Sequence, residues 1–123
     1  TIRRGNFIGL RLLYKARIPV HIYAISGIHR EGHTLVIPKR HVAEYFDITD
    51  AERRDADALL KYLKRKMTKK DPSITGYNIG VNCGESAGQT IFHVHYHLIP
   101  RRDGDTEDPR GGIRGVMPGK RSY

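Results

Sequence analysis

Three histidines stand at alternate positions in one short segment of the chain, at His93, His95 and His97. Successive side chains of a β-strand point to opposite faces, so a strand over residues 92–99 would place the three imidazoles on one face at intervals of roughly 6.5–7 Å. The other face would be apolar and directed at the core. Its members are Phe92, Val94, Tyr96 and Leu98. The alternation therefore predicts a strand with one face for chemistry and one for packing.

Three neutral imidazoles on one face suit two kinds of chemistry. They could bind a divalent metal, since imidazole is a ligand for zinc, copper, iron and nickel. Alternatively, one imidazole could act as a nucleophile while its neighbours position it and move protons. The spacing leaves both open, but the preceding loop over residues 82–90 favours the second. It offers glycine N–H groups, amides and hydroxyls that suit phosphate oxygens, and Glu85 is the one carboxylate nearby in sequence.

A helix over residues 49–70 is the clearest element that could support such a strand. Thr49 with Glu52 three residues later forms a capping box, which satisfies N–H groups at a helix start. An apolar stripe follows at helical spacing. Its members are Ala56, Leu59, Leu60, Leu63 and Met67.

The remaining elements are predicted to be strands and loops. We expect strands over residues 7–14, 20–25, 33–37, 74–82 and 92–99, with a turn around residues 17–19. Pro38 and Pro100 should each end a strand, because proline cannot donate to a ladder. Strands that mostly follow one another directly indicate an α+β fold, an antiparallel sheet of about five strands with one main helix. We expect a single domain over residues 1–102 and a C-terminal extended arm over residues 103–123.

Composition limits the kind of protein that this chain can be. With 123 residues it has room for one domain, and its formal net charge is +9. Residues 1–40 carry eight Lys/Arg and one acid, a net charge of +7 that would attract polyanions or phosphate-bearing ligands. A single cysteine, Cys83, suits a reducing cytosol, and we expect a cytoplasmic protein with no secretory signal and no membrane span.

Three segments in order resemble the histidine triad superfamily. Residues 93–99 read HVHYHLI, which is similar to the family's pattern of histidines alternating with apolar residues. Residues 32–41 (GHTLVIPKRH) resemble its second signature, and residues 78–84 (NIGVNCG) followed by 87–90 (AGQT) resemble its third. The resemblance covers residues 31–102, and the tail over residues 104–118 resembles an extension found in a prokaryotic branch of the family.

The resemblance implies a role for each histidine. His95 would be the nucleophile and would form a transient nucleotidyl-imidazole, which divides one difficult displacement at phosphorus into two easier ones. His97 and His33 would orient His95 or share protons, with a backbone carbonyl fixing the tautomer. His93 would lie near the phosphate and the leaving group.

The resemblance also implies a phosphate site and an assembly. Asn82, Gln89 and Thr90 would hold phosphate oxygens, and nearby N–H groups would stabilise charge in the transition state. No cofactor would be required, although a divalent cation bound with the substrate phosphates is compatible with this chemistry. The family further implies a homodimer in which two sheets join into one, with the C-terminal arm reaching toward the partner.

The chain departs from the family pattern before residue 31. Members usually carry an acid eight residues before the histidine that corresponds to His33, where it accepts hydrogen bonds from ribose hydroxyls. Here that residue is Ile25, followed by Ser26. The usual proline before the Gly-His pair is also replaced. The way in which this protein would hold a ribose is therefore left open.

Three functions compete on the sequence alone. The first is a nucleotide hydrolase or nucleotidyl transferase that releases AMP or another nucleoside monophosphate from dinucleoside polyphosphates or nucleoside phosphoramidates. The second, motivated by Ile25 and the basic front, is a nucleotide- or nucleic-acid-binding module with little turnover. The third is a metalloprotein that uses His93, His95 and His97.

Overall fold

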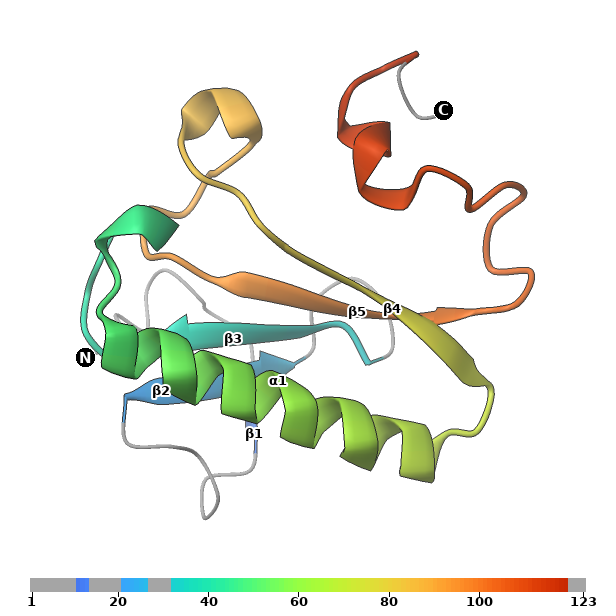
Figure 1. The fold of residues 1–123 in the computed structure, drawn as a ribbon, viewed down its shortest axis with the longest axis horizontal. Coiled ribbons are helices and arrows are strands. Elements are labelled where there is room, and N and C mark those ends of the chain that lie inside the picture. Colours follow the sequence, from blue (N-terminus) through green and yellow to red (C-terminus); the bar gives the residue numbers. More distant parts are fainter. Residues whose placement is uncertain (1–10, 14–20, 27–31, 120–123) are drawn as a thin grey trace.

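The computed structural model describes residues 11–13, 21–26 and 32–119, which form an α+β fold (Figure 1). Five strands make one sheet in the order β1-β2-β3-β5-β4, and every neighbouring pair is antiparallel. The strands are β1 (Arg11–Leu13), β2 (Ile22–Ser26), β3 (Thr34–Pro38), β4 (Ile74–Val81) and β5 (Tyr96–Arg102). The predicted fold class is confirmed. The predicted turn at residues 17–19 and most of the strand predicted over residues 7–14 lie outside the described residues.

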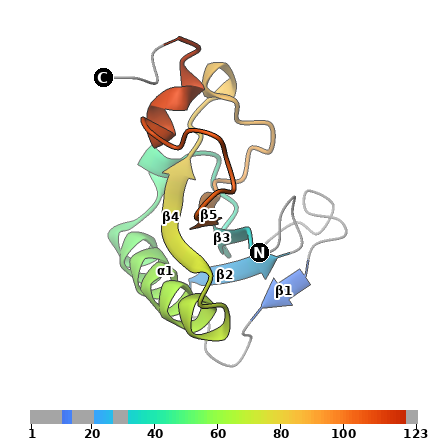
Figure 2. The same cartoon turned by 90° about the vertical axis from the view of Figure 1, so that its right-hand side faces the viewer.

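The helix α1 (Asp50–Lys70) lies across one face of the sheet (Figures 1 and 2). Both hydrogen bonds of the predicted capping box are present: the Thr49 hydroxyl accepts from the Glu52 N–H, and a Glu52 carboxylate oxygen accepts from the Thr49 N–H. Lys69 and Lys70 in the last turn complement the helix dipole. The helix was thus predicted to within one residue at its start.

The two faces of the sheet carry different apolar clusters. The larger cluster lies between α1 and the sheet, and its members from β5 are Tyr96 and Leu98. The predicted helix stripe joins it, with Ala56, Leu59, Leu60 and Leu63 buried and Met67 partly buried. A smaller cluster of Ile25, Leu35 and Ile37 lies on the opposite face. The face covered by α1 therefore holds the larger part of the core, and the other face holds the smaller part.

The strand β5 differs from its predicted bounds at both ends. It begins at Tyr96 because the residues before it leave the ladder, and the Val94 N–H donates instead to the Val42 carbonyl at 2.8 Å. As a result Phe92, predicted to face the core, is about half exposed. The strand continues through Pro100, which was predicted to end it. Pairing with β3 stops at Leu98, so the missing N–H of proline interrupts no bond on that side. Pro38 likewise lies within β3 rather than after it.

The C-terminal arm folds back beside β4 and contains a 3₁₀ helix, Gly112–Val116 (Figure 2). An ion pair holds the turn from which the arm departs. The Arg101 guanidinium donates to both carboxylate oxygens of Asp105, at 2.9 and 2.8 Å, and to the Asn78 side-chain oxygen at 2.7 Å. The Arg102 backbone N–H also donates to Asp105. The direction of the arm is therefore set at the end of β5.

Candidate active site

The site is built around contacts between histidine rings from the residue before β3, from β5 and from the loop before β5. His33 Nε2 and His97 Nδ1 lie 3.0 Å apart, so one donates a hydrogen bond to the other. The rings of His95 and His97 follow, with centroids 5.1 Å apart. His33, His97 and His95 thus form a continuous series of contacts, and the roles expected of these three residues stay predictions.

A backbone carbonyl determines which nitrogen of His95 carries the proton. His95 Nδ1 lies 2.9 Å from the carbonyl oxygen of His93, and a carbonyl can only accept. The Nδ1 atom must therefore donate, which places the lone pair of a neutral ring on the Nε2 atom. The side chain is partly exposed, so a substrate can approach it.

His93 is placed differently from the prediction that all three imidazoles share one strand face. It precedes β5, is fully buried, and its Nε2 atom lies 2.8 Å from the carbonyl of Pro38, to which it donates. Burial lowers the pKa of His93 and outweighs the hydrogen bond to Pro38, which acts in the opposite direction. The exposed His41 packs its ring edge-on against His93, with centroids 5.0 Å apart. His93 therefore links the site to the segment that follows β3.

Glycine at position 32 allows the chain to place His33 at the start of β3. Its φ is +87°, and a Cβ there would lie 2.8 Å from the Pro100 side chain. Any other residue would have to displace that ring. The Gly32 carbonyl accepts a hydrogen bond from the buried Thr34 hydroxyl at 2.9 Å, which fixes the entry into the strand.

Strand register places His97 in a row that crosses the sheet on the face away from α1. Leu35 pairs with both Ile25 and His97, and His97 pairs with Gly80 of β4. Directly paired residues point to the same face, so the imidazole has apolar side chains on one side and a glycine on the other. Ile25, at the position where the family pattern has an acid, is buried in the small cluster of this face. It offers no hydrogen bond to a ligand.

The loop after β4 is held together by Gln89, which is buried. Its side-chain oxygen accepts from the Gly84 N–H at 2.8 Å, and its amide donates to the carbonyls of Ala43 and Ile91 at 2.6 and 3.1 Å. The hydrogen bonds of the Gln89 side chain therefore connect the loop to the segment that follows β3. Its role toward phosphate stays a prediction.

The other two residues predicted to hold phosphate lie in the same loop. Asn82 is partly exposed and Thr90 is exposed, so both side chains are accessible to a ligand. The position of Gly88, whose φ is +92°, allows its backbone to approach the Asn82 amide. Cys83 is partly buried and forms no disulfide within the described residues.

One ion pair, between the segment after β3 and α1, is not predictable from the sequence. The Arg40 guanidinium donates to both carboxylate oxygens of Glu52, at 3.1 and 2.8 Å, and to the Asp47 carbonyl at 3.0 Å. Burial would raise the pKa of Glu52, but the hydrogen bonds from Arg40 and Thr49 outweigh it, and the pKa is lowered. The only local signal was Glu52 in the capping box. The pair ties the segment after β3 to the start of α1.

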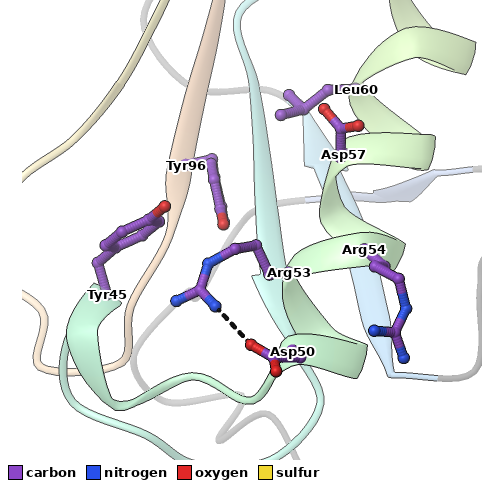
Figure 3. Close-up of a pocket in the computed structure, with 7 residues that line it drawn as sticks. All are labelled: Tyr45, Asp50, Arg53, Arg54, Asp57, Leu60 and Tyr96. Atoms are coloured by element: carbon purple, nitrogen blue, oxygen red, sulfur yellow. Dashed lines mark hydrogen bonds and ion pairs between the residues drawn. The ribbon is translucent and has the colours of Figure 1, made fainter.

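A pocket of about 510 Å³ opens on the helix side of the sheet, away from the histidine row (Figure 3). Tyr96 lines it, although this residue stands between His95 and His97 in sequence. The Arg53 guanidinium lies 5.2 Å from the centroid of the Tyr45 ring and donates to Asp50 at 3.1 Å. Burial raises the pKa of Tyr96 to about 12, so its phenol keeps its proton at neutral pH and does not act as a base.

Neither a metal-ligand cluster nor a membrane-spanning helix is present in the described residues. Within residues 11–13, 21–26 and 32–119, no group of three or more His, Cys, Asp or Glu side chains is arranged to hold a metal ion. In the same residues no helix combines the length and the apolar character that crossing a bilayer requires.

Known proteins are similar to this chain in both sequence and fold. The HIT domain family model matches residues 15–104. The adenosine 5′-monophosphoramidase of Saccharomyces cerevisiae is 44% identical over 73 residues, which are 59% of this chain and 43% of the relative. The asymmetrical bis(5′-nucleosyl)-tetraphosphatase of Schizosaccharomyces pombe is 34% identical over 98 residues, which are 80% of this chain and 53% of the relative.

A solved structure agrees with these sequence matches. The NitFhit protein of Caenorhabditis elegans superposes with a TM-score of 0.70 at 34% identity, covering 85% of this chain and 24% of that one. The chain spans about half the length of the two enzymes above and a quarter of NitFhit. With the matched domain, the ordered motifs and the antiparallel fold in agreement, the chain belongs to the histidine triad superfamily.

Proposed function

We propose that this protein is a nucleotide hydrolase or nucleotidyl transferase in which His95 attacks the α-phosphate of its substrate. The observation that carries the proposal is the 2.9 Å contact from His95 Nδ1 to the His93 carbonyl. With Nδ1 donating, a neutral ring carries its lone pair on Nε2, which is the protonation state that a nucleophilic imidazole needs.

The chemistry then proceeds in two displacements. His95 Nε2 forms a bond to phosphorus as the bond to the leaving group breaks, and the product is a nucleotidyl-imidazole. Water or another acceptor then attacks phosphorus, which frees the nucleoside monophosphate and restores the lone pair on Nε2. His97, in contact with His33, is placed to orient His95 and to exchange protons.

Two substrate classes are supported by the relatives. One relative is a phosphoramidase and another cleaves dinucleoside tetraphosphates. Both reactions release a nucleoside monophosphate by attack at phosphorus, and the same histidine could perform either. The net charge of +9 would raise the local concentration of such anionic substrates.

The alternative of a binding module rests on one observation, the buried Ile25 on the site face. A site without an acceptor at this position would make fewer hydrogen bonds to a bound nucleoside. Binding without turnover would then be the main property of the protein.

We further propose a cytoplasmic homodimer that joins two sheets through β4. This strand ends the described sheet order, so one of its edges is not paired within the described residues. Ile79 on this strand is 50% exposed. A two-fold symmetric contact between two copies of the chain would pair this edge of β4 and cover the Ile79 side chain.

The deciding experiment measures AMP release, by chromatography, from diadenosine tetraphosphate and from adenosine 5′-phosphoramidate. Wild type should release AMP from one or both, and His95→Ala should release none. His21→Ala is a matched control, because His21 is exposed and bonded to Asp55 at 2.7 Å. Nucleotide binding without release by wild type would favour the binding module. Equal turnover by wild type and His95→Ala would refute the mechanism.

A further inference from the structure

The charged side chains of α1 are divided unevenly between its two halves. Residues 50–60 carry four acids and two arginines. Residues 61–70 carry no acid and six basic side chains, which are Lys61, Lys64, Arg65, Lys66, Lys69 and Lys70. Cations complement the helix dipole only in the last turn, which accounts for Lys69 and Lys70. The dipole does not account for the four basic residues before them.

Four of these side chains form one row along α1, which we call the basic face: Lys61, Lys64, Arg65 and Lys69. Residues three or four apart are neighbours on a helix surface, and all four are exposed. Leu63, between them in sequence, is fully buried in the core against the sheet. Figure 2 shows the opposite side of α1 facing outward. At 1.5 Å per residue the row extends about 12 Å along the helix.

The basic face is weakly neutralised by the protein itself. Lys61 lies 3.3 Å from a carboxylate oxygen of Asp57, but these side chains are 69% and 66% exposed, so water screens the pair. Among the described residues, Lys64, Arg65 and Lys69 have no ion pair. Like charges four residues apart repel, and the row contains two such pairs. Folding therefore gains nothing from this arrangement, whereas a bound anion would relieve the repulsion.

Two features of this surface indicate which kind of polyanion fits it. A helix that lies on a membrane inserts its apolar side chains, and those of α1 are buried against the sheet. An interface with another protein centres on aromatic or apolar anchors and is depleted in lysine, whereas the basic face consists of three lysines and one arginine. A chain of phosphates needs no apolar anchor, because it is bound through charge.

We propose that the basic face of α1 binds the phosphate backbone of nucleic acid without reading its base sequence. Phosphates of one DNA strand follow one another at about 3.4 Å along the axis, so a row of about 12 Å spans three or four of them. Contacts of lysine and arginine to phosphate carry no sequence information. The basic face lies on the α1 side of the sheet, whereas Leu35 and its partner His97 lie on the other face. Binding of nucleic acid is therefore separable from the proposed turnover.

The test measures binding of a fluorescein-labelled DNA duplex of mixed sequence, by fluorescence anisotropy, between about 50 and 200 mM NaCl. Contact with three or four phosphates predicts a slope of about −3 for log K against log salt, which is a loss of affinity of about sixtyfold over this range. Lys64→Gln combined with Arg65→Gln should lower the affinity at least about tenfold at the lower salt and reduce the slope by about two. A duplex of unrelated sequence should bind equally.

Two further double variants are matched controls. Arg54→Gln combined with Arg110→Gln removes the same charge from exposed positions outside the basic face, and should change the affinity less than about twofold because salt screens distant charges. Lys64→Arg combined with Arg65→Lys keeps both charges and should bind like wild type. Each variant should keep the thermal unfolding midpoint of wild type, and Lys64→Gln combined with Arg65→Gln should keep its rate of AMP release.

Three results would overturn the inference. The first is equal affinity of wild type and the variant that lacks the charges of Lys64 and Arg65. The second is an equally large loss in the control that lacks the charges of Arg54 and Arg110. The third is binding to phosphatidylglycerol vesicles, lost in the first variant, by a wild type that does not bind the duplex, which would assign the basic face to a membrane surface instead.

Discussion

At the scale of single residues, the His33–His97 contact couples two side chains that are 64 positions apart in sequence. If His97 orients His95 and His33 orients His97, their effects on rate cannot be independent. His97→Ala should lower kcat by about 10²–10⁴, and His33→Ala by a smaller factor of about ten. The double variant should be no slower than His97→Ala alone. Single-turnover rates of the three variants would test this, and a double loss equal to the product of the single losses would contradict it.

Burial of His93 should make the stability of the protein depend on pH. Its pKa is lowered in the folded state from the ordinary value near 6.5, chiefly because burial disfavours the charged ring. Below that value the unfolded chain binds a proton that the folded one does not, so acid favours unfolding. The contribution of His93 is fully present above about pH 6.5 and is lost as the pH falls through its lowered pKa.

The corresponding measurement is urea unfolding between pH 7.5 and about pH 5. The free energy of unfolding of wild type should fall with pH, and His93→Gln should show a shallower fall over the same range. A variant with the same pH dependence as wild type would show that His93 does not carry the effect.

At the scale of secondary structure, the Arg40–Glu52 ion pair joins the segment after β3 to α1. The Glu52 side chain is 3% exposed, whereas that of Arg40 is 50% exposed. Arg40→Ala leaves a buried carboxylate whose one remaining donor among the described residues is the Thr49 N–H. Loss of one partner of a fully buried pair costs roughly 3–5 kcal/mol, and water reaching this half-exposed site should reduce the cost to about 2 kcal/mol.

Arg40→Lys separates geometry from charge in this pair. It keeps the positive charge but cannot donate to both oxygens in a fork, so it should recover only part of the lost stability. The control is Arg54→Ala, at an exposed position of α1, the helix that carries Glu52. It should change the free energy of unfolding by less than about 0.5 kcal/mol. The urea concentration at the unfolding midpoint would be measured for all three variants. A midpoint of Arg40→Ala equal to that of wild type would contradict a stabilising role for the ion pair.

The sequence predicts α1 well because its signals are local. The capping box and an apolar stripe lie within the segment that they describe, and both are present in the structure. The bounds of β5 were predicted poorly for a related reason. Alternation of polar and apolar residues has the same period in a strand and in an extended loop, so nothing local shows that the ladder begins only at Tyr96.

The site was predictable where it depends on residue type and not where it depends on distant partners. The motifs single out His33, His97 and His95, whose rings lie in contact in the structure. The buried His93 donates a hydrogen bond to the Pro38 carbonyl, 55 positions away. Gln89 donates one to the Ala43 carbonyl, 46 positions away. Such long-range bonds have no signature in a single sequence.

At the scale of the whole molecule, the proposed dimer makes a prediction about β4. Ile79 pairs with Leu98, so it points to the same side of the sheet as α1, at the edge strand of the described sheet. Ile79→Lys would place a charge where two edges meet, and lysine on an edge strand blocks pairing. Sedimentation should show a dimer for wild type and a monomer for Ile79→Lys, with Phe46→Lys still dimeric. A wild type that is monomeric at every concentration would contradict the proposed assembly.

The central place of β5 in the sheet also governs when the site can form during synthesis. β5 pairs with β3 on one side and β4 on the other, although it follows both in sequence. Until residues 96–102 leave the ribosome, β3 has no neighbour on that side and His33 has no partner ring. Insertion of β5 brings together residues far apart in the chain, a slow kind of step in folding. Catalytic competence should therefore arise in this step, when the last strand closes the sheet.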